Sequence, residues 1–228
     1  MLLTASDLAA LKGALIVSAQ AYPGEPMRDP RTMAQVAASA VIGGAKAVRV
    51  QGLADISATR SAVQVPVIGL FKDGHQGVFI TPTLHHALAV AAAGAHVVAL
   101  DGTRRPRPDG LTLAETIAGI RATSGATVMA DCGSLEDAIA AAAAGADLIG
   151  TTLAGYTGER PKTQGPDLEL LEAIVAADLG VPVIAEGRIH TPAQARAALD
   201  AGAHAVVVGT AITHPATLTG WFLDALES

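Results

Sequence analysis

Two kinds of segment alternate along this chain, and their alternation constrains the fold more than any other feature. Short runs rich in valine, isoleucine and alanine occur eight times and predict buried strands at residues 14–20, 47–51, 65–72, 96–101, 127–131, 148–152, 181–186 and 205–209. Alanine-rich segments separate them and favour helices, because alanine has the highest helix propensity. We expect these helices at residues 31–43, 54–63, 83–93, 113–124, 135–144, 167–177, 192–201 and 216–226.

A weak internal repeat supports the same division. A Gly-Ala pair precedes every second predicted strand, at residues 44–45, 94–95, 145–146 and 202–203, where a glycine that ends a helix is expected. Helix starts are also marked, because Ser134 precedes two acidic residues and Thr191 precedes a proline. Each repeat therefore contains two strand–helix units.

Strands that are apolar throughout predict a parallel sheet covered on both faces. Eight strand–helix units in 228 residues predict closure into one (β/α)₈ TIM barrel that spans residues 1–228 as a single domain. An open, doubly wound sheet is the alternative. It is disfavoured because no Gly-x-Gly-x-x-Gly motif follows the first strand.

Composition excludes several functional classes. Half of the residues are apolar, which argues against disorder, and the net charge of −6 argues against a nucleic-acid-binding surface. The longest apolar stretches fall short of the roughly 20 residues that cross a bilayer, so we expect no membrane partner. Asp7 and Lys12 interrupt any export signal, and the single cysteine, Cys132, excludes an internal disulfide. We therefore expect a cytoplasmic protein.

Polar residues stand at the end of every predicted strand, where barrels carry their chemistry. In chain order they are Gln20, Arg49 with Gln51, Lys72, Asp101, Asp131, Thr151 with Thr152, Glu186 with Arg188, and Gly209 with Thr210. Asp101 and Asp131, taken singly, are equally well explained as helix caps. The convergence of the whole set on one end of a barrel predicts a functional site.

Two of these residues are candidates for proton transfer. Lys72 follows the apolar run 66–71, which should partly desolvate its ammonium group and lower its pKa. A neutral lysine acts as a general base or as a Schiff-base nucleophile. Glu186 also follows apolar residues, although we expect the nearby Arg188 to keep it ionised.

Other motifs suggest which ligands the site takes. Gly187-Arg188 and Gly209-Thr210 follow the last two predicted strands, where barrels bind phosphate through backbone amides. Metal chemistry is disfavoured, because His85 and His86 are adjacent and the other histidines are scattered. Cys132 lacks a visible base and is expected to be a small buried group. The basic loop at residues 104–108 is interpreted as a stiff solvated loop or as a lid over phosphate.

These residues also carry a resemblance to a known family. The chain resembles the N-acylglucosamine-6-phosphate 2-epimerases of bacterial sialic acid breakdown over nearly its whole length. The matching segments are residues 15–20, 48–49, 66–72, 99–103, 129–131, 150–157, 184–188 and 208–213. The resemblance implies interconversion of N-acetylmannosamine 6-phosphate and N-acetylglucosamine 6-phosphate without a cofactor.

By that resemblance, Lys72 moves the proton on carbon 2 and Glu186 assists through a substrate hydroxyl. The expected sugar-binding residues are Gln20, Arg49, Asp101, Asp131, Thr151 and Tyr156, and the expected phosphate-binding residues are Gly187, Arg188, Gly209, Thr210 and His214. Two positions depart from the family pattern. Ala19 replaces a usual cysteine, and His214 replaces a usual arginine, which leaves one phosphate contact open.

Two other functions remain open from the residues alone. If Lys72 forms a Schiff base, the protein is an aldolase acting on a sugar phosphate. If the polar strand ends only bind, it is a sugar-phosphate sensor without catalysis. In each case the expected partner is a small phosphorylated sugar, and the sequence allows a homodimer.

Overall fold

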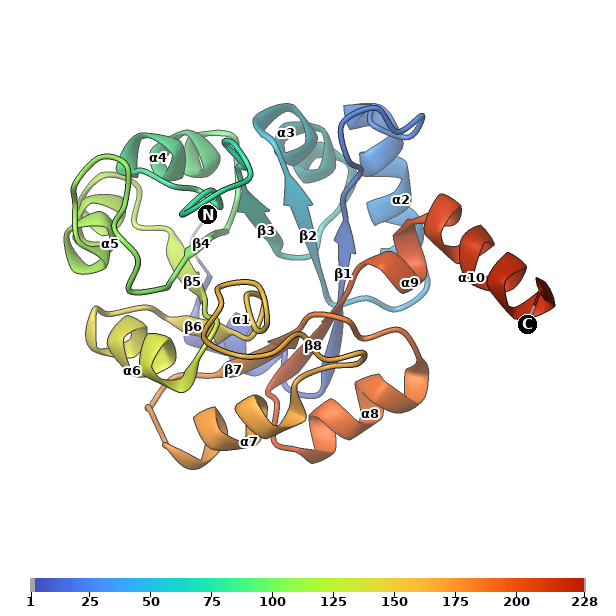
Figure 1. The fold of residues 1–228 in the computed structure, drawn as a ribbon. Helices are drawn as coiled ribbons and strands as arrows, with labels where there is room; N and C mark the ends of the chain where they lie inside the picture. The colour runs from blue at the N-terminus through green and yellow to red at the C-terminus, as the bar shows by residue number, and fades with distance from the viewer. Residues whose placement is uncertain (1–2, 228) are drawn as a thin grey trace.

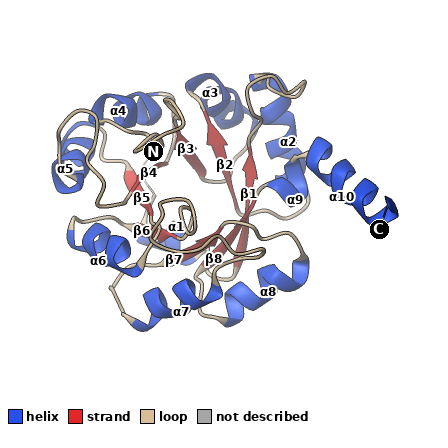
Figure 2. Cartoon of the chain, in the orientation of Figure 1, coloured by secondary structure: helices blue, strands red, loops and turns tan. Residues whose placement is uncertain are grey.

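The computed structural model describes residues 3–227 and confirms the predicted barrel (Figures 1 and 2). Eight parallel strands form one closed sheet in chain order, and β1 pairs with β8 to close it. The strands are β1 (Ala14–Ala19), β2 (Ala47–Gln51), β3 (Val67–Leu70), β4 (Val97–Asp101), β5 (Thr127–Asp131), β6 (Leu148–Gly150), β7 (Val183–Glu186) and β8 (Ala205–Val208). Where a predicted strand differs from the observed one, the prediction is longer by one or two residues at one end or, for β3, at both ends.

Helices follow the first seven strands and form the outer ring visible in Figure 2. They are α2 (Pro30–Ile42), α3 (Leu53–Ala62), α4 (Leu84–Ala92), α5 (Leu113–Thr123), α6 (Leu135–Ala143), α7 (Leu168–Ala176) and α8 (Pro192–Asp200). The predicted boundary signals are confirmed. Ser134 and Thr191 cap α6 and α8 through their hydroxyls, and the repeated glycines at 44, 94, 145 and 202 adopt φ values of 106°, 104°, 97° and 96°.

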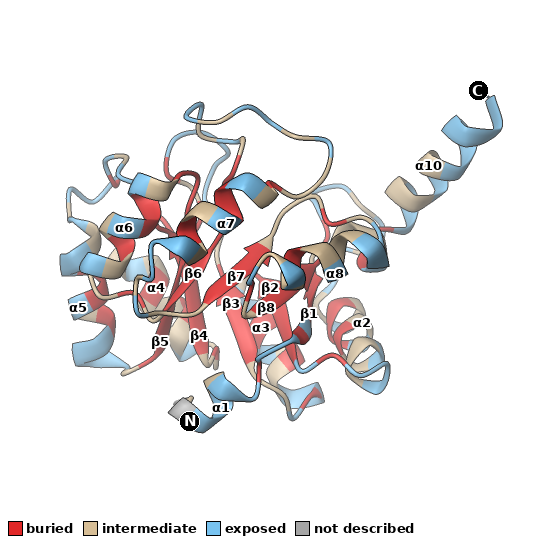
Figure 3. Ribbon diagram, turned by 90° about the horizontal axis from the view of Figure 1, so that it is seen from below, coloured by how far each residue is buried: buried red, intermediate tan, exposed pale blue. Residues whose placement is uncertain are grey.

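Two further helices were not predicted. α1 (Ala5–Ala9) precedes the barrel, and the short α9 (Thr210–Thr213) follows β8. The helix predicted at residues 216–226 is confirmed as α10 (Pro215–Glu227), which extends away from the barrel (Figures 1 and 3) and contains no buried residue. His214 precedes a proline and is extended, with φ −118° and ψ 77°, so the chain changes direction there.

The core has two layers on either side of the sheet. One lies inside the barrel and includes Ile16, Ile68, Met129 and Ile184, and the other lies between the strands and the surrounding helices. Each buried side chain of this size contributes about 1.5–3 kcal/mol relative to an exposed one. Figure 3 shows the resulting buried strands inside partly exposed helices. The interior is thus packed solid beneath the site.

Within residues 3–227, no helix has the length and apolar character needed to cross a membrane.

Candidate active site

A cavity of about 780 Å³ opens at the carboxyl ends of the strands. Among the predicted site residues, it is lined by Gln20, Arg49, Lys72, Tyr156, Glu186, Gly187, Arg188, Gly209, Thr210 and His214. The structure thus brings most of the sequence-derived set together around one space.

Arg49 is the centre of a buried charge network at the floor of the cavity. Its two terminal nitrogens donate to both oxygens of Asp131, at 3.1 and 2.6 Å, and Nη1 also lies 3.0 Å from Glu186 Oε2. Arg49 comes from β2, Asp131 from β5 and Glu186 from β7, so the barrel closure brings the three strands' charges together. The carboxylates keep the pKa of Arg49 above its ordinary range despite full burial.

Glu186 is more perturbed than we expected. Burial raises its pKa to about 7, and the nearby Asp131 charge adds to the rise, while Arg49 and a hydrogen bond with Thr152 oppose it. The expectation that Arg188 keeps Glu186 ionised is wrong. The guanidinium next to Glu186 belongs to Arg49, whereas that of Arg188 donates to the carbonyl of Ala154. A carboxyl group with a pKa near neutrality exchanges protons readily at physiological pH.

Lys72 stands beyond the end of β3 and is held there by a bridge to Ile80, where the chain folds back. Its Nζ donates to Gln20 Oε1 at 3.1 Å. Burial lowers the pKa of Lys72 to about 8, assisted by the positive charge of Arg49 and opposed by Glu186 and Asp131. The predicted desolvation is therefore present, and a substantial fraction of this lysine is neutral near pH 8.

The backbone approaches the cavity closely at two turns on the predicted phosphate side. Gly187 has φ 116° and Arg188 has φ 53°, so the chain after β7 adopts conformations that favour glycine. After β8, Gly209 precedes the short helix α9, and the first amides of that helix, at Thr210 and Ala211, have no acceptor within it. Gly187, Arg188, Gly209 and Thr210 line the cavity, and in the closed barrel β7 lies opposite β3.

The guanidinium of Arg188 is already occupied by the β6–α7 loop, residues 151–167. It donates to the carbonyls of Gly165 and Ala154, at 3.1 and 2.8 Å, and to the hydroxyl of Thr163 at 2.9 Å. It also lies 5.3 Å from the ring of Tyr156. Arg188 therefore holds this loop against the mouth of the cavity.

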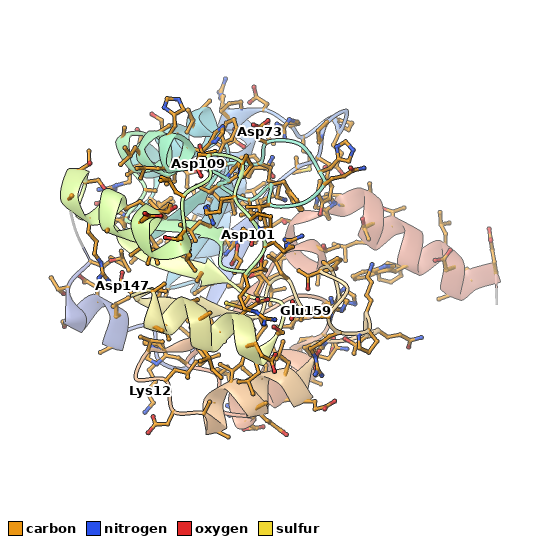
Figure 4. All side chains as sticks on the ribbon, turned by 60° about the vertical axis from the view of Figure 1, so that its left-hand side comes forward. Lys12, Asp73, Asp101, Asp109, Asp147 and Glu159 are labelled. Atoms are coloured by element: carbon orange, nitrogen blue, oxygen red, sulfur yellow. The ribbon has the colours of Figure 1, made fainter. Side chains whose placement is uncertain are left out.

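Three predicted residues do not line the cavity. Asp101 is fully buried and bonds to Thr103 and Arg105, and Asp131 reaches the site through Arg49. The Thr151 hydroxyl donates to the backbone carbonyl of Glu186 at 2.9 Å and so joins β6 to β7. Figure 4 shows Asp101 among the side chains at the centre of the view.

The basic loop at residues 104–108 is neither free in solvent nor over the cavity. Arg105 pairs with Asp101, and Arg107 is buried and donates to the carbonyls of Asp101 and Thr81. Arg104 is half exposed and pairs with Asp137 and Glu159. The arginines therefore fasten this loop to the barrel.

Several cavity residues were missed by the strand-end reasoning. Tyr22 and Arg28 come from the β1–α2 loop, and His190 comes from the β7–α8 loop. They lie in connections rather than at strand ends, so the alternation of segments gives no signal for them. Tyr22 packs against His214, with ring centroids 4.9 Å apart.

Cys132 is fully buried, and burial raises the pKa of its thiol well above the ordinary value, so it is the inert small group that we expected. No group of three or more potential ligands that could hold a metal ion occurs among residues 3–227.

The sequence and the fold were compared with those of known proteins. A family model described as "Putative N-acetylmannosamine-6-phosphate epimerase" matches residues 33–228. A protein of Cutibacterium acnes named as a putative N-acetylmannosamine-6-phosphate 2-epimerase is 66% identical over 221 residues, which cover 96% of each chain. A protein of the same name from Corynebacterium glutamicum is 48% identical and covers 96% of this chain and 95% of its own.

A solved structure, the N-acetylmannosamine-6-phosphate 2-epimerase of Clostridium perfringens, superposes with a TM-score of 0.91 at 39% identity. The match covers 96% of this chain and 95% of that one. A thiamine phosphate pyrophosphorylase from Pyrococcus furiosus has a TM-score of 0.61 at 21% identity and shows only that the barrel is shared. On these matches, the chain belongs to the N-acetylmannosamine-6-phosphate 2-epimerase family.

Proposed function

We propose that this protein interconverts N-acetylmannosamine 6-phosphate and N-acetylglucosamine 6-phosphate by moving the proton on carbon 2 of the sugar. The observation that carries the proposal is the pairing of Lys72 and Glu186 around one cavity. Their pKa values of about 8 and about 7 suit proton transfer near neutral pH. Family membership supports the same reaction.

In the proposed mechanism, neutral Lys72 removes the proton from carbon 2 of the open-chain aldose. The electron pair of the broken bond moves toward the aldehyde and gives an enolate-like intermediate. The cationic groups that face the cavity, Arg49 and the newly protonated Lys72, stabilise its negative charge. Protonated Lys72 then returns a proton to the opposite face of carbon 2, once that face has turned toward it, which inverts the centre and restores the neutral amine. Glu186 assists through a substrate hydroxyl.

The remaining predicted residues have supporting roles in this proposal. Gln20 and Tyr156 contact the sugar from the cavity wall. The other three residues act indirectly: Asp131 holds Arg49, Asp101 holds the loop between β4 and α5 through Arg105, and Thr151 holds the end of β7. Gly187, Arg188, Gly209 and Thr210 receive the phosphate through their backbone amides, next to His214. No metal ion or cofactor enters this scheme.

Proton NMR in heavy water tests the reaction directly. When N-acetylmannosamine 6-phosphate is incubated with the protein, we expect the signal of the carbon 2 proton to disappear as the second epimer forms. Borohydride trapping of a covalent adduct to Lys72 would instead support the aldolase. Binding of the sugar phosphate without exchange would support the sensor, and either outcome would contradict the proposal.

We also propose that the protein is a cytoplasmic homodimer built from residues 1–228 as one barrel domain. Phe222 and Leu226 on α10 are 74% and 83% exposed, and Leu15 on the outer face of β1 is 37% exposed. Because α10 extends away from the barrel (Figure 1), apolar side chains are left exposed on α10 and on the outer face of β1, and a second copy can cover them. Light scattering should give a dimer for the full chain and a monomer for Phe222→Asp with Leu226→Asp.

A further inference from the structure

The β1–α2 loop, residues 20–29, brings a charged and aromatic cluster to the phosphate side of the cavity. Tyr22 packs on His214, and Glu25 Oε1 lies 3.4 Å from His214 Nδ1. The same loop carries Arg28, whose amide donates to the Glu25 carbonyl. The loop therefore places one histidine, one carboxylate and one guanidinium near the end of β8.

His214 is poorly placed to replace the arginine that is usual in the family. It is buried between the Tyr22 ring and the Glu25 carboxylate. A carboxylate next to this imidazole repels an approaching phosphate dianion, which offsets the attraction of a protonated histidine. The positive charge for the substrate's phosphate must then come from another side chain.

Three arginines line the cavity, and two of them are already occupied. Arg49 pairs with Asp131 and Glu186, and all three nitrogens of the Arg188 guanidinium donate to the β6–α7 loop. Arg28 differs from both. Its Nη1 donates to the Ala21 carbonyl at 2.9 Å, and it forms no ion pair with a carboxylate in the part of the chain that the structure describes.

The single bond to Ala21 holds the guanidinium at the mouth and leaves Nε and Nη2 free for an anion. A guanidinium suits this task, because its planar fork can donate to two phosphate oxygens at once. The charge of Arg28 also reaches the reaction centre. After burial and the charge of Arg49, it is a further contribution that lowers the pKa of Lys72.

We propose that Arg28 binds the phosphate of the substrate in this chain and supplies the charge that the family usually carries at position 214. The inference rests on the proposed epimerisation of a sugar phosphate, since it assigns the phosphate of that substrate. It also explains why His214 can stay paired with Glu25.

Calorimetric titration with inorganic phosphate tests Arg28 without requiring turnover. We expect Arg28→Gln to weaken phosphate binding about tenfold, the loss typical of one charge-assisted hydrogen bond. Arg31→Gln is the matched control, because it removes the same charge from a residue that is exposed at the start of α2 and lies outside the cavity. That control should bind phosphate as the wild type does.

Steady-state kinetics gives a second measurement. Arg28→Gln should raise KM for N-acetylmannosamine 6-phosphate about tenfold with little change in kcat, and Arg28→Lys should restore part of the loss. Unchanged phosphate binding in Arg28→Gln would overturn the inference, as would an equal loss in Arg31→Gln or a larger loss in His214→Gln. Phosphate binding that depends on Arg28 in a protein without epimerase activity would leave the inference intact and refute only the proposed reaction.

Discussion

The floor and the mouth of the cavity are built in different ways. Arg49, Asp131 and Glu186 come from strands, are almost completely buried and satisfy one another's charges. Tyr22 and Arg28 at the mouth come from a loop and are exposed. Tyr22 has a tilted ring contact with His214, and Arg28 donates to a backbone carbonyl. The barrel therefore fixes the position and the pKa of Glu186, one of the groups proposed to move protons, while the proposed substrate contacts at the mouth come from a loop.

This difference has an energetic consequence. A buried charge that loses its partner costs far more than an exposed one, because it can no longer be solvated. Substitutions at the floor should therefore affect stability and chemistry together. Substitutions at the mouth should change binding and leave the fold intact.

The largest expected effect is that of Lys72→Met on turnover. Removal of a general base typically lowers the rate by about 10²–10⁴-fold, and Met keeps the length of the apolar stem, so the fold should survive. The rate of carbon 2 proton exchange measures the effect. Lys12→Met is the control, since Lys12 is exposed and lies just before the start of β1, at the end of the barrel opposite the cavity. Near-normal exchange in Lys72→Met would refute the proposed mechanism.

Arg49→Met should have the next largest effect, on stability. The substitution leaves the buried carboxylates of Asp131 and Glu186 without the guanidinium that pairs with both, which costs about 3–5 kcal/mol for a buried pair. Urea denaturation followed by circular dichroism measures this loss. Arg196→Met removes an exposed arginine that pairs with Asp200 and should cost less than about 1 kcal/mol. Equal losses in the two variants would remove the distinction between floor and surface.

Glu186→Gln should shift the pH dependence of kcat/KM. The carboxylate of Glu186 raises the pKa of Lys72, so replacing it with a neutral amide lowers that pKa further below its present value of about 8. Because the neutral lysine is the active form, the rising limb of the profile should move to lower pH, even though the maximum rate falls. Asp147→Asn, a carboxylate remote from the cavity, should leave the limb in place. A limb that stays in place or moves to higher pH in Glu186→Gln would contradict the coupling.

The fold and the residues that form the floor of the site could be predicted, although not their pairing, because both follow from local sequence patterns. Strand runs, helix caps and the repeated glycines such as Gly94 are determined by neighbouring residues, and closure of eight units then brings the strand ends together. The lowered pKa of Lys72 could be inferred from the apolar residues before it. Its partner Gln20 could be placed at the same end of the barrel, although the bond between them could not.

The parts that escaped prediction depend on contacts between distant segments. Arg188 is two residues from Glu186, yet it turns to the β6–α7 loop, and the cation beside Glu186 is Arg49 of β2. The direction of α10 likewise depends on the turn at His214. Pro215 indicates locally only that the helix is interrupted there. Pairings of this kind are set by the closed barrel, so they cannot be predicted from each strand taken separately.

The smallest expected effect belongs to the mouth, in His214→Arg. Arginine offers a permanently charged planar fork that can donate to two phosphate oxygens at once, which an imidazole cannot do, so substrate binding should tighten by about 1 kcal/mol. Glu25 limits the gain, because it is placed to pair with the new guanidinium. Measurements of KM for N-acetylmannosamine 6-phosphate in both forms give the size of this gain. Identical KM values would show that residue 214 does not act on the phosphate, whereas a gain that grows in Arg28→Gln/His214→Arg would show that the two positions serve the same anion.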